Sequence, residues 1–123
     1  SLDGVIRTEN ADRIQAKLIA EGANGPVSSA AQKVLDDKGI ITIPDILCNA
    51  GGVIVSYFEW VQGLQNFFWS EDEVNSQLRE VMNKAFYRVA QTADHHKCNM
   101  KMAALITSID RLTKAMLLRG LYP

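Results

Sequence analysis

The sequence predicts an α/β fold, with a short parallel sheet segment followed by three helices that make the chain helix-rich overall. Two observations predict it. An apolar run, a segment with helix start and stop signals and a β-branched run follow one another within residues 17–43, as in a βαβ unit. After residue 51 the apolar residues recur every three or four positions, which is the period of a helix.

Composition limits the classes of protein. The chain has 123 residues, a formal net charge of −1 and 47 % apolar residues, which is typical of one soluble globular unit. It has no dense basic block, so neither nucleic acid nor an anionic membrane is an expected partner. It also lacks an apolar run of roughly 18 residues and a signal-peptide pattern, so a cytoplasmic location is expected. The two cysteines are interpreted as reduced thiols.

The first half of the chain supplies the βαβ unit. Thr8 is expected to cap a short helix through residue 15, and residues 17–20 form a strand that enters a glycine-rich loop at 21–26. Ser28 and Ser29 precede a helix that stops before Gly39. The β-branched residues 40–43 form a second strand, expected to run parallel to the first and to be buried on both faces.

The second half supplies three helices. The first carries one apolar stripe, made of Ile54, Tyr57, Phe58, Val61, Leu64 and Phe68. Ser70 and Glu73 form a predicted capping box, with Trp69 on Val74 as a possible staple, at the start of a helix through residue 93. The last helix begins near residue 100 and stops at Gly120. Its apolar side consists of Leu105, Ile106, Ile109, Leu112, Met116 and Leu117. Because two parallel strands rarely stand alone, we expect a single truncated unit whose missing strands precede it.

Two Asn-Gly segments are candidate binding residues. Gly22, Asn24 and Gly25 lie in the loop after the first strand, where ligands bind in open α/β sheets, although the loop is not a G-x-G-x-x-G fingerprint. From the residues alone, Gly22 and Gly25 are interpreted first as turn residues, and Asn24 fits either a left-handed backbone or a ligand contact. Asn49 is placed at the end of the second strand, so the two segments are expected side by side. It is favoured slightly as a helix N-cap, and a ligand contact can coexist with that role.

Other polar residues point less clearly to chemistry. Ser56 lies at the margin of the apolar stripe, and its hydroxyl either bonds back to the carbonyl four residues earlier or faces a ligand. No metal site is expected from His95, His96 and Cys98, because adjacent helical side chains diverge and no second cluster completes a ligand set. The residues alone therefore indicate part of a ligand-binding α/β domain and specify no reaction.

The chain resembles the C-terminal part of a glutamate dehydrogenase of the hexameric class, over essentially its whole length. The resemblance is carried by AEGANGP at 20–26, IPDILCNAGGVIVSYFEWVQ at 43–62, FFWSEDEV at 67–74 and LRGLYP at 118–123. It implies NAD(P)-dependent oxidative deamination of L-glutamate to 2-oxoglutarate and ammonia. It also implies that residues 1–68 are the last part of a Rossmann-like nucleotide-binding domain, and that residues 69–123 are helices that return toward the substrate domain.

The resemblance also assigns roles to residues. Gly22, Ala23 and Asn24 are expected to border the nicotinamide ribose of NAD or NADP, and Asn49 to lie beside both nicotinamide and substrate. Val53 and Ser56 are expected to line the pocket for the substrate side chain, with the serine hydroxyl on the distal carboxylate, which favours glutamate over apolar amino acids.

The catalytic lysine and aspartate of the family have no counterpart here. The resemblance therefore implies no catalytic residue in this chain, which alone is expected to be inactive and to self-associate, whereas the parent is expected to be a homo-hexamer. The alternatives are a non-catalytic helical interaction module and a partial nucleotide-binding unit descended from the family.

Overall fold

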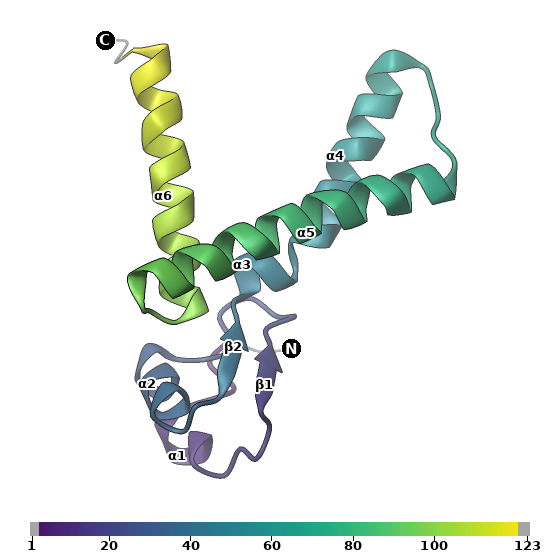
Figure 1. Ribbon diagram of the computed structural model, residues 1–123. Coiled ribbons are helices and arrows are strands. Elements are labelled where there is room, and N and C mark those ends of the chain that lie inside the picture. The colour runs from purple at the N-terminus through teal and green to yellow at the C-terminus, as the bar shows by residue number, and fades with distance from the viewer. Residues whose placement is uncertain (1–2, 121–123) are drawn as a thin grey trace.

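The computed structural model describes residues 3–120. The α/β half (residues 3–48) and the helical half (residues 49–120) occupy different ends of the molecule in Figure 1, where α4 and α6 project away from the strands. The elements in order are α1 (Thr8–Ala11), β1 (Leu18–Ala20), α2 (Ser29–Asp37), β2 (Ile41–Ile43), α3 (Asp45–Cys48), α4 (Ala50–Gln65), α5 (Glu71–His96) and α6 (Met100–Arg119). Among residues 3–120, no helix is long and apolar enough to cross a membrane.

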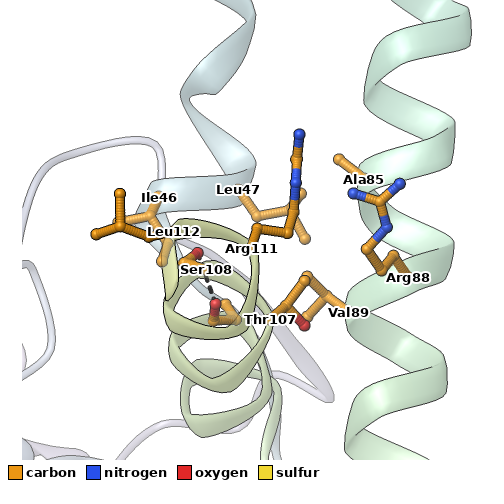
Figure 2. Close-up of a pocket in the computed structure, with 10 residues that line it drawn as sticks. Ile46, Leu47, Ala85, Arg88, Val89, Thr107, Ser108, Arg111 and Leu112 are labelled. Carbon is orange, nitrogen blue, oxygen red and sulfur yellow. Dashed lines mark hydrogen bonds between the residues drawn. The ribbon is translucent and has the colours of Figure 1, made fainter. Parts of the chain in front are cut away.

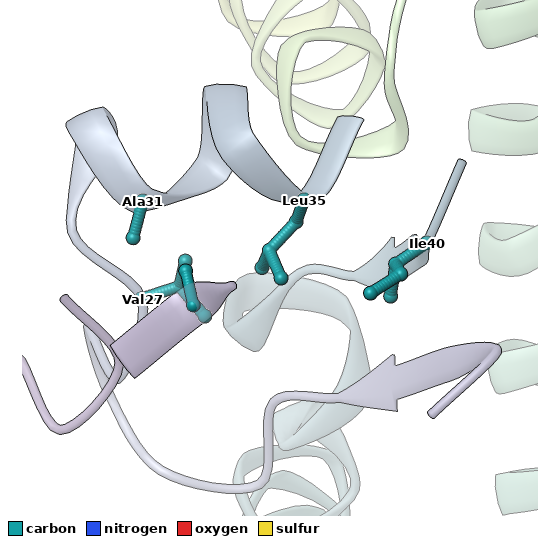
Figure 3. Close-up of a cluster of buried hydrophobic side chains, with 5 residues drawn as sticks. Val27, Ala31, Leu35 and Ile40 are labelled. Atoms are coloured by element: carbon teal, nitrogen blue, oxygen red, sulfur yellow. The ribbon is translucent and has the colours of Figure 1, made fainter. Parts of the chain in front are cut away.

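The α/β half is built around a parallel strand pair. Leu18 lies opposite Ile41 and Ala20 opposite Ile43, which confirms the predicted parallel pairing. The Ser28 Oγ accepts the N–H of Ala31 at 3.2 Å and so begins α2, as the sequence predicts. The buried side chains between α2 and the strands, drawn in Figure 3, are Ala11, Val27, Ala31, Leu35 and Ile40.

Two predictions for this half are wrong. The first helix has Arg7, not Thr8, at its N-cap, because the Asn10 Oδ1 accepts the Arg7 N–H at 2.8 Å. The helix ends at Ala11, before the predicted residue 15. The second strand is not buried on both faces. Thr42 is buried beneath α2, but Ile41 on the other face is 55 % exposed, because on that face Ile43 packs against the cluster of Leu47, Val89, Ala103 and Ala104 and Ile41 does not.

The ends of α4 and α5 follow local capping. α4 ends at Gln65, because Asn66 adopts a left-handed conformation with φ of 50°, and Phe68 of the predicted apolar stripe therefore lies outside the helix. The predicted capping box of α5 is confirmed: the Ser70 Oγ accepts the Glu73 N–H at 3.3 Å, and Glu73 accepts the Ser70 N–H at 2.7 Å. The Trp69 ring lies 5.4 Å from that of Phe58, and the staple on Val74 stays a prediction.

The last two helices pack against each other and against α3. Gly120 ends α6 with a positive φ of 77°, as the sequence predicts. The residues 121–123, which complete the LRGLYP motif, lie outside the described part. The shared buried cluster consists of Leu47, Val89, Ala103 and Ala104. Most of the predicted apolar stripe of α6 lies outside it, since Ile109, Leu112, Met116 and Leu117 are exposed.

Candidate functional site

The candidate site lies at the carboxyl ends of β1 and β2. The Glu21 N–H donates to the carbonyl of Ile43 at 3.1 Å, so the two strand ends lie side by side. The sequence prediction that residues 48–52 follow the second strand directly is wrong. The strand ends at Ile43, because Pro44 has no N–H for the ladder, and the single turn of α3 separates it from Asn49.

Asn24 and Asn49 meet between the loop at 21–26 and the start of α4, a junction that we call the crevice. The Nδ2 of Asn49 donates to the Oδ1 of Asn24 at 2.7 Å, which confirms that the two Asn-Gly segments lie side by side. Asn49 occupies the N-cap position of α4, but its side chain makes no capping hydrogen bond. The interpretation of its side chain as a cap is therefore wrong, because the amide is used across the crevice.

The loop at 21–26 is held by reciprocal bonds with α3. The Asp45 N–H donates to the Oε2 of Glu21 at 2.9 Å, and the Gly25 N–H donates to the Oδ2 of Asp45 at 2.8 Å. Gly25 has a φ of +58°, and a Cβ there would lie 2.5 Å from the Oδ1 of Asp3. The positive φ therefore favours glycine at this position, and a Cβ there would also require the Asp3 side chain to move.

The expected substrate contacts lie on one face of α4. Asn49, Val53 and Ser56 are spaced by four and three residues, which aligns them on a helix. Val53 is 75 % exposed, and the Ser56 hydroxyl is exposed while it donates to the carbonyl of Gly52 at 3.1 Å. This bond confirms the first interpretation of Ser56. It leaves the hydroxyl accessible, so a ligand contact remains compatible with it.

The cofactor residues differ in exposure. Gly22 and Asn24 are exposed, and Ala23 is half-buried. The polar groups that the Asn24–Asn49 bond leaves over are the Nδ2 of Asn24, which donates, and the Oδ1 of Asn49, which accepts. A nicotinamide carboxamide needs one acceptor and one donor, so this pair fits its chemistry.

Sequence reasoning missed one part of this region. Glu21 was interpreted only as a loop residue, yet its side chain is fully buried and faces Lys101 of α6, with 3.5 Å between Nζ and Oε1. The signal in the sequence is a carboxylate directly after an apolar strand, where a buried charge requires a partner. The identity of that partner, 80 positions away, has no local signal.

A groove of about 490 Å³ lies elsewhere, between α3, α5 and α6. Figure 2 shows Arg88 of α5 and Arg111 of α6 beside it, together with the apolar side chains of Leu47 and Val89. None of the residues that line it is a candidate cofactor or substrate residue. The groove and the crevice are therefore separate features.

Two carboxyl groups of α5 have lowered pKa values. Hydrogen bonds from the backbone and side chain of Ser70 lower the pKa of Glu73, and the hydrogen bond and charge of Lys84 lower the pKa of Glu80. Both carboxylates are on the surface and outside the crevice. Within residues 3–120 no three His, Cys, Asp or Glu side chains are grouped so as to hold a metal ion.

Comparison with known proteins gives the family. The sequence model of the "Glutamate/Leucine/Phenylalanine/Valine dehydrogenase" family matches residues 1–120. The glutamate dehydrogenase of Thermotoga maritima is 49 % identical over all 123 residues, which are 30 % of its own length. The crystal structure of glutamate dehydrogenase from Peptoniphilus asaccharolyticus matches 99 % of this chain with a TM-score of 0.93 and 43 % identity, over 31 % of that protein.

A second solved structure agrees with the first. The hetero-hexameric glutamate dehydrogenase of Thermus thermophilus, in its Leu-bound form, matches 98 % of this chain with a TM-score of 0.93 and 35 % identity, over 29 % of that protein. The chain thus spans about a third of the length of these relatives. Because the family model covers nearly every residue and both the sequence and the backbone agree, the chain belongs to the glutamate/leucine/phenylalanine/valine dehydrogenase family.

Proposed function

We propose that this chain is the C-terminal part of an NAD(P)-dependent glutamate dehydrogenase, which oxidatively deaminates L-glutamate to 2-oxoglutarate and ammonia. The observation that carries the proposal is the contact of Asn24 with Asn49 at the ends of two parallel strands. It supports a crevice with a donor and an acceptor for the carboxamide of NAD(P). The identity of 49 % to a glutamate dehydrogenase over the whole chain favours glutamate as substrate.

The proposed role of this chain's residues is to bind the cofactor and the substrate and to orient them. When bound, the nicotinamide ring accepts a hydride from the substrate. We propose that Gly22 and Ala23 allow the ribose to approach the backbone, and that Asn24 and Asn49 hold the carboxamide. No residue of this chain is assigned to proton transfer or to catalysis. The chain by itself is therefore proposed to be inactive.

Ser56 supplies the proposed substrate specificity. To bind the distal carboxylate of glutamate, its hydroxyl turns away from the Gly52 carbonyl and donates to the carboxylate. The cost is small, because in an α-helix that carbonyl still accepts the backbone N–H of residue 56. An apolar amino acid offers no acceptor there, which discriminates against it.

The remaining expectations belong to the same proposal. Residues 1–68 form the last part of the nucleotide-binding domain, and residues 69–123 are the helices that return toward the substrate domain. We propose that the complete enzyme is a cytoplasmic homo-hexamer; the hetero-hexameric Thermus thermophilus relative supports an assembly of six subunits. The exposed apolar side chains of α4 and α6 support self-association of the chain by itself.

The test is Ser56→Ala in the complete enzyme. A hydrogen bond to a charged group is worth about 1.5–3 kcal/mol, so kcat/KM for glutamate is expected to fall roughly ten- to hundredfold, with the dissociation constant of NAD(P)H unchanged. The matched control is Ser108→Ala, because the Ser108 Oγ likewise donates to a carbonyl four residues earlier, that of Ala104, at 2.8 Å. An unchanged kcat/KM for Ser56→Ala, or an equal loss in the control, would contradict the assignment.

A further inference from the structure

The feature that carries a new inference is the buried carboxylate of Glu21. Its side chain is 0 % exposed, and it has two partners: the Asp45 N–H at 2.9 Å and the Lys101 Nζ at 3.5 Å. The Lys101 side chain is 31 % exposed and also donates to the carbonyl of Val27 at 3.4 Å. One lysine of α6 therefore contacts both ends of the loop that carries Asn24.

The contact of Lys101 with Glu21 offsets the free-energy cost of burying the Glu21 carboxylate. A carboxylate removed from water is tolerated only when it is paired and hydrogen-bonded. Without Lys101, Glu21 retains one neutral donor, the Asp45 N–H, which does not neutralise its charge. The charged group is then expected to move toward water, which disturbs the bond that fixes the loop to α3.

Three bonded residues connect Glu21 to Asn49, so a displacement of Glu21 is expected to move the Asn24 side chain. Glu21 fixes Asp45, and the Oδ2 of Asp45 accepts the N–H of Gly25 at 2.8 Å. Gly25 follows Asn24, whose Oδ1 accepts the Asn49 amide at 2.7 Å. Each link is a hydrogen bond or a peptide bond, so the position of Asn24 depends on the charge of Lys101.

We propose that Glu21 and Lys101 form a positioning pair that holds the Asn24–Asn49 contact in place and couples α6 to the crevice. Neither residue touches the ligand. The pair sets where the carboxamide donor and acceptor lie, while the N-terminal turn of α6 is held against the loop. The inference rests on the proposed function in one respect, namely that the Asn24–Asn49 pair binds the nicotinamide end of the cofactor.

The test measures binding of two probes to the complete enzyme, NADH or NADPH and ADP-ribose, which lacks the nicotinamide. The variants are Lys101→Met, which keeps the stem but removes the charge, and Glu21→Gln, which keeps the shape but offers one oxygen where the Asp45 N–H and the Lys101 Nζ use two. Each is expected to weaken the reduced cofactor about tenfold, a loss of about 1.4 kcal/mol, and to leave ADP-ribose within about twofold. Lys101→Arg is expected to restore binding to within about twofold, because it retains the charge.

Two further variants sharpen the result. Lys114→Met is the matched control, because Lys114 lies on the same helix and pairs only with the exposed Asp110 at 2.7 Å. It is expected to change neither probe. The double variant of Glu21→Gln and Lys101→Met is expected to lose no more than either single variant, because the two residues act as one unit.

The outcomes separate this inference from the proposed function. Equal weakening of both probes in Lys101→Met and Glu21→Gln indicates a general structural role and overturns the inference, as does unchanged binding of the reduced cofactor. If Lys101→Met does not fold, Glu21→Gln alone decides. A wild-type enzyme that binds neither probe contradicts the proposed function instead.

Discussion

The two halves of this molecule bury their apolar side chains to different degrees. In the α/β half, elements of only three to nine residues surround one cluster that includes the fully buried Leu35. In the helical half, α4 buries Phe58 and Gln62 among its 16 residues, and α5 buries Val89 alone among its 26. Burial thus does not follow the amount of regular structure, because short elements that converge exclude more water than long helices that diverge.

The two halves show that local capping, which helps a helix to form, is distinct from tertiary packing, which stabilises the fold. α5 has a capping box, and its exposed pair of Lys84 with Glu80 four residues earlier adds local support. α2 has a simple serine cap but packs on the buried cluster. We therefore expect substitutions in the α/β half to change global stability, and most substitutions in the helical arms to act locally or on association.

The largest contrast is expected between two leucines. Leu35 is 0 % exposed, so Leu35→Ala should lower the free energy of unfolding by about 2–5 kcal/mol. Leu112 is 63 % exposed, and Leu112→Ala should change it by no more than about 0.5 kcal/mol in the same 123-residue chain. Urea denaturation of both variants measures the contrast. Similar losses at the two sites would show that the halves are equally packed.

The next effect is on association of the chain. Leu112→Lys with Leu117→Lys places two charges on the exposed stripe of α6, where Leu117 is 72 % exposed. Removing leucine burial of about 1.5–3 kcal/mol per side chain should weaken self-association at least roughly tenfold in sedimentation experiments. Ala115→Lys, at an exposed position outside the stripe on the same helix, is the control for added positive charge. Equal weakening in the control would assign the effect to charge.

A smaller effect is expected from the two serine caps. Ser28→Ala removes the acceptor for the Ala31 N–H and should lower the free energy of unfolding by about 1 kcal/mol, because α2 packs on the buried cluster. Ser70→Ala removes the equivalent acceptor of α5, whose first turn is exposed, and should act mainly by fraying that turn. Denaturation and hydrogen exchange of the two helix starts separate the outcomes. A larger global loss for Ser70→Ala would reverse the comparison.

The smallest effect depends on pH at the start of α5. The pKa of Glu73 is lowered below its ordinary value of 4.5, first by the backbone and then by the side-chain hydrogen bond with Ser70. Its stabilisation of the first turn is therefore fully present above that value and is lost as the pH falls through the lower folded-state pKa. Hydrogen exchange of the Glu73 amide should accelerate relative to its unfolded-chain rate over this range. Glu73→Gln should abolish the dependence, whereas Glu80→Gln should preserve it.

Local signals in the sequence were sufficient to predict several of the helix ends. The serine cap of α2, the capping box of Ser70 with Glu73 and the glycine after α6 all act within four residues, so the structure agrees with them. Predictions failed where neighbouring groups compete. The Asn10 side chain moved the first cap to Arg7, and the left-handed Asn66 ended α4 before the apolar stripe was complete. Periodicity cannot detect either event, because it averages over several turns.

In the candidate site too, some features were predicted from local sequence and others depend on the tertiary structure. The sequence by itself predicted that the two Asn-Gly segments lie side by side, and it offered the bond of Ser56 back along its helix as one of two interpretations. It did not predict the turn of α3 that separates Asn49 from its strand. Only the tertiary structure decided which apolar stripes are covered, and that Lys101 reaches the buried Glu21. The physical reason is that burial and charge pairing depend on which distant surfaces meet, and the residues on one surface do not specify the other.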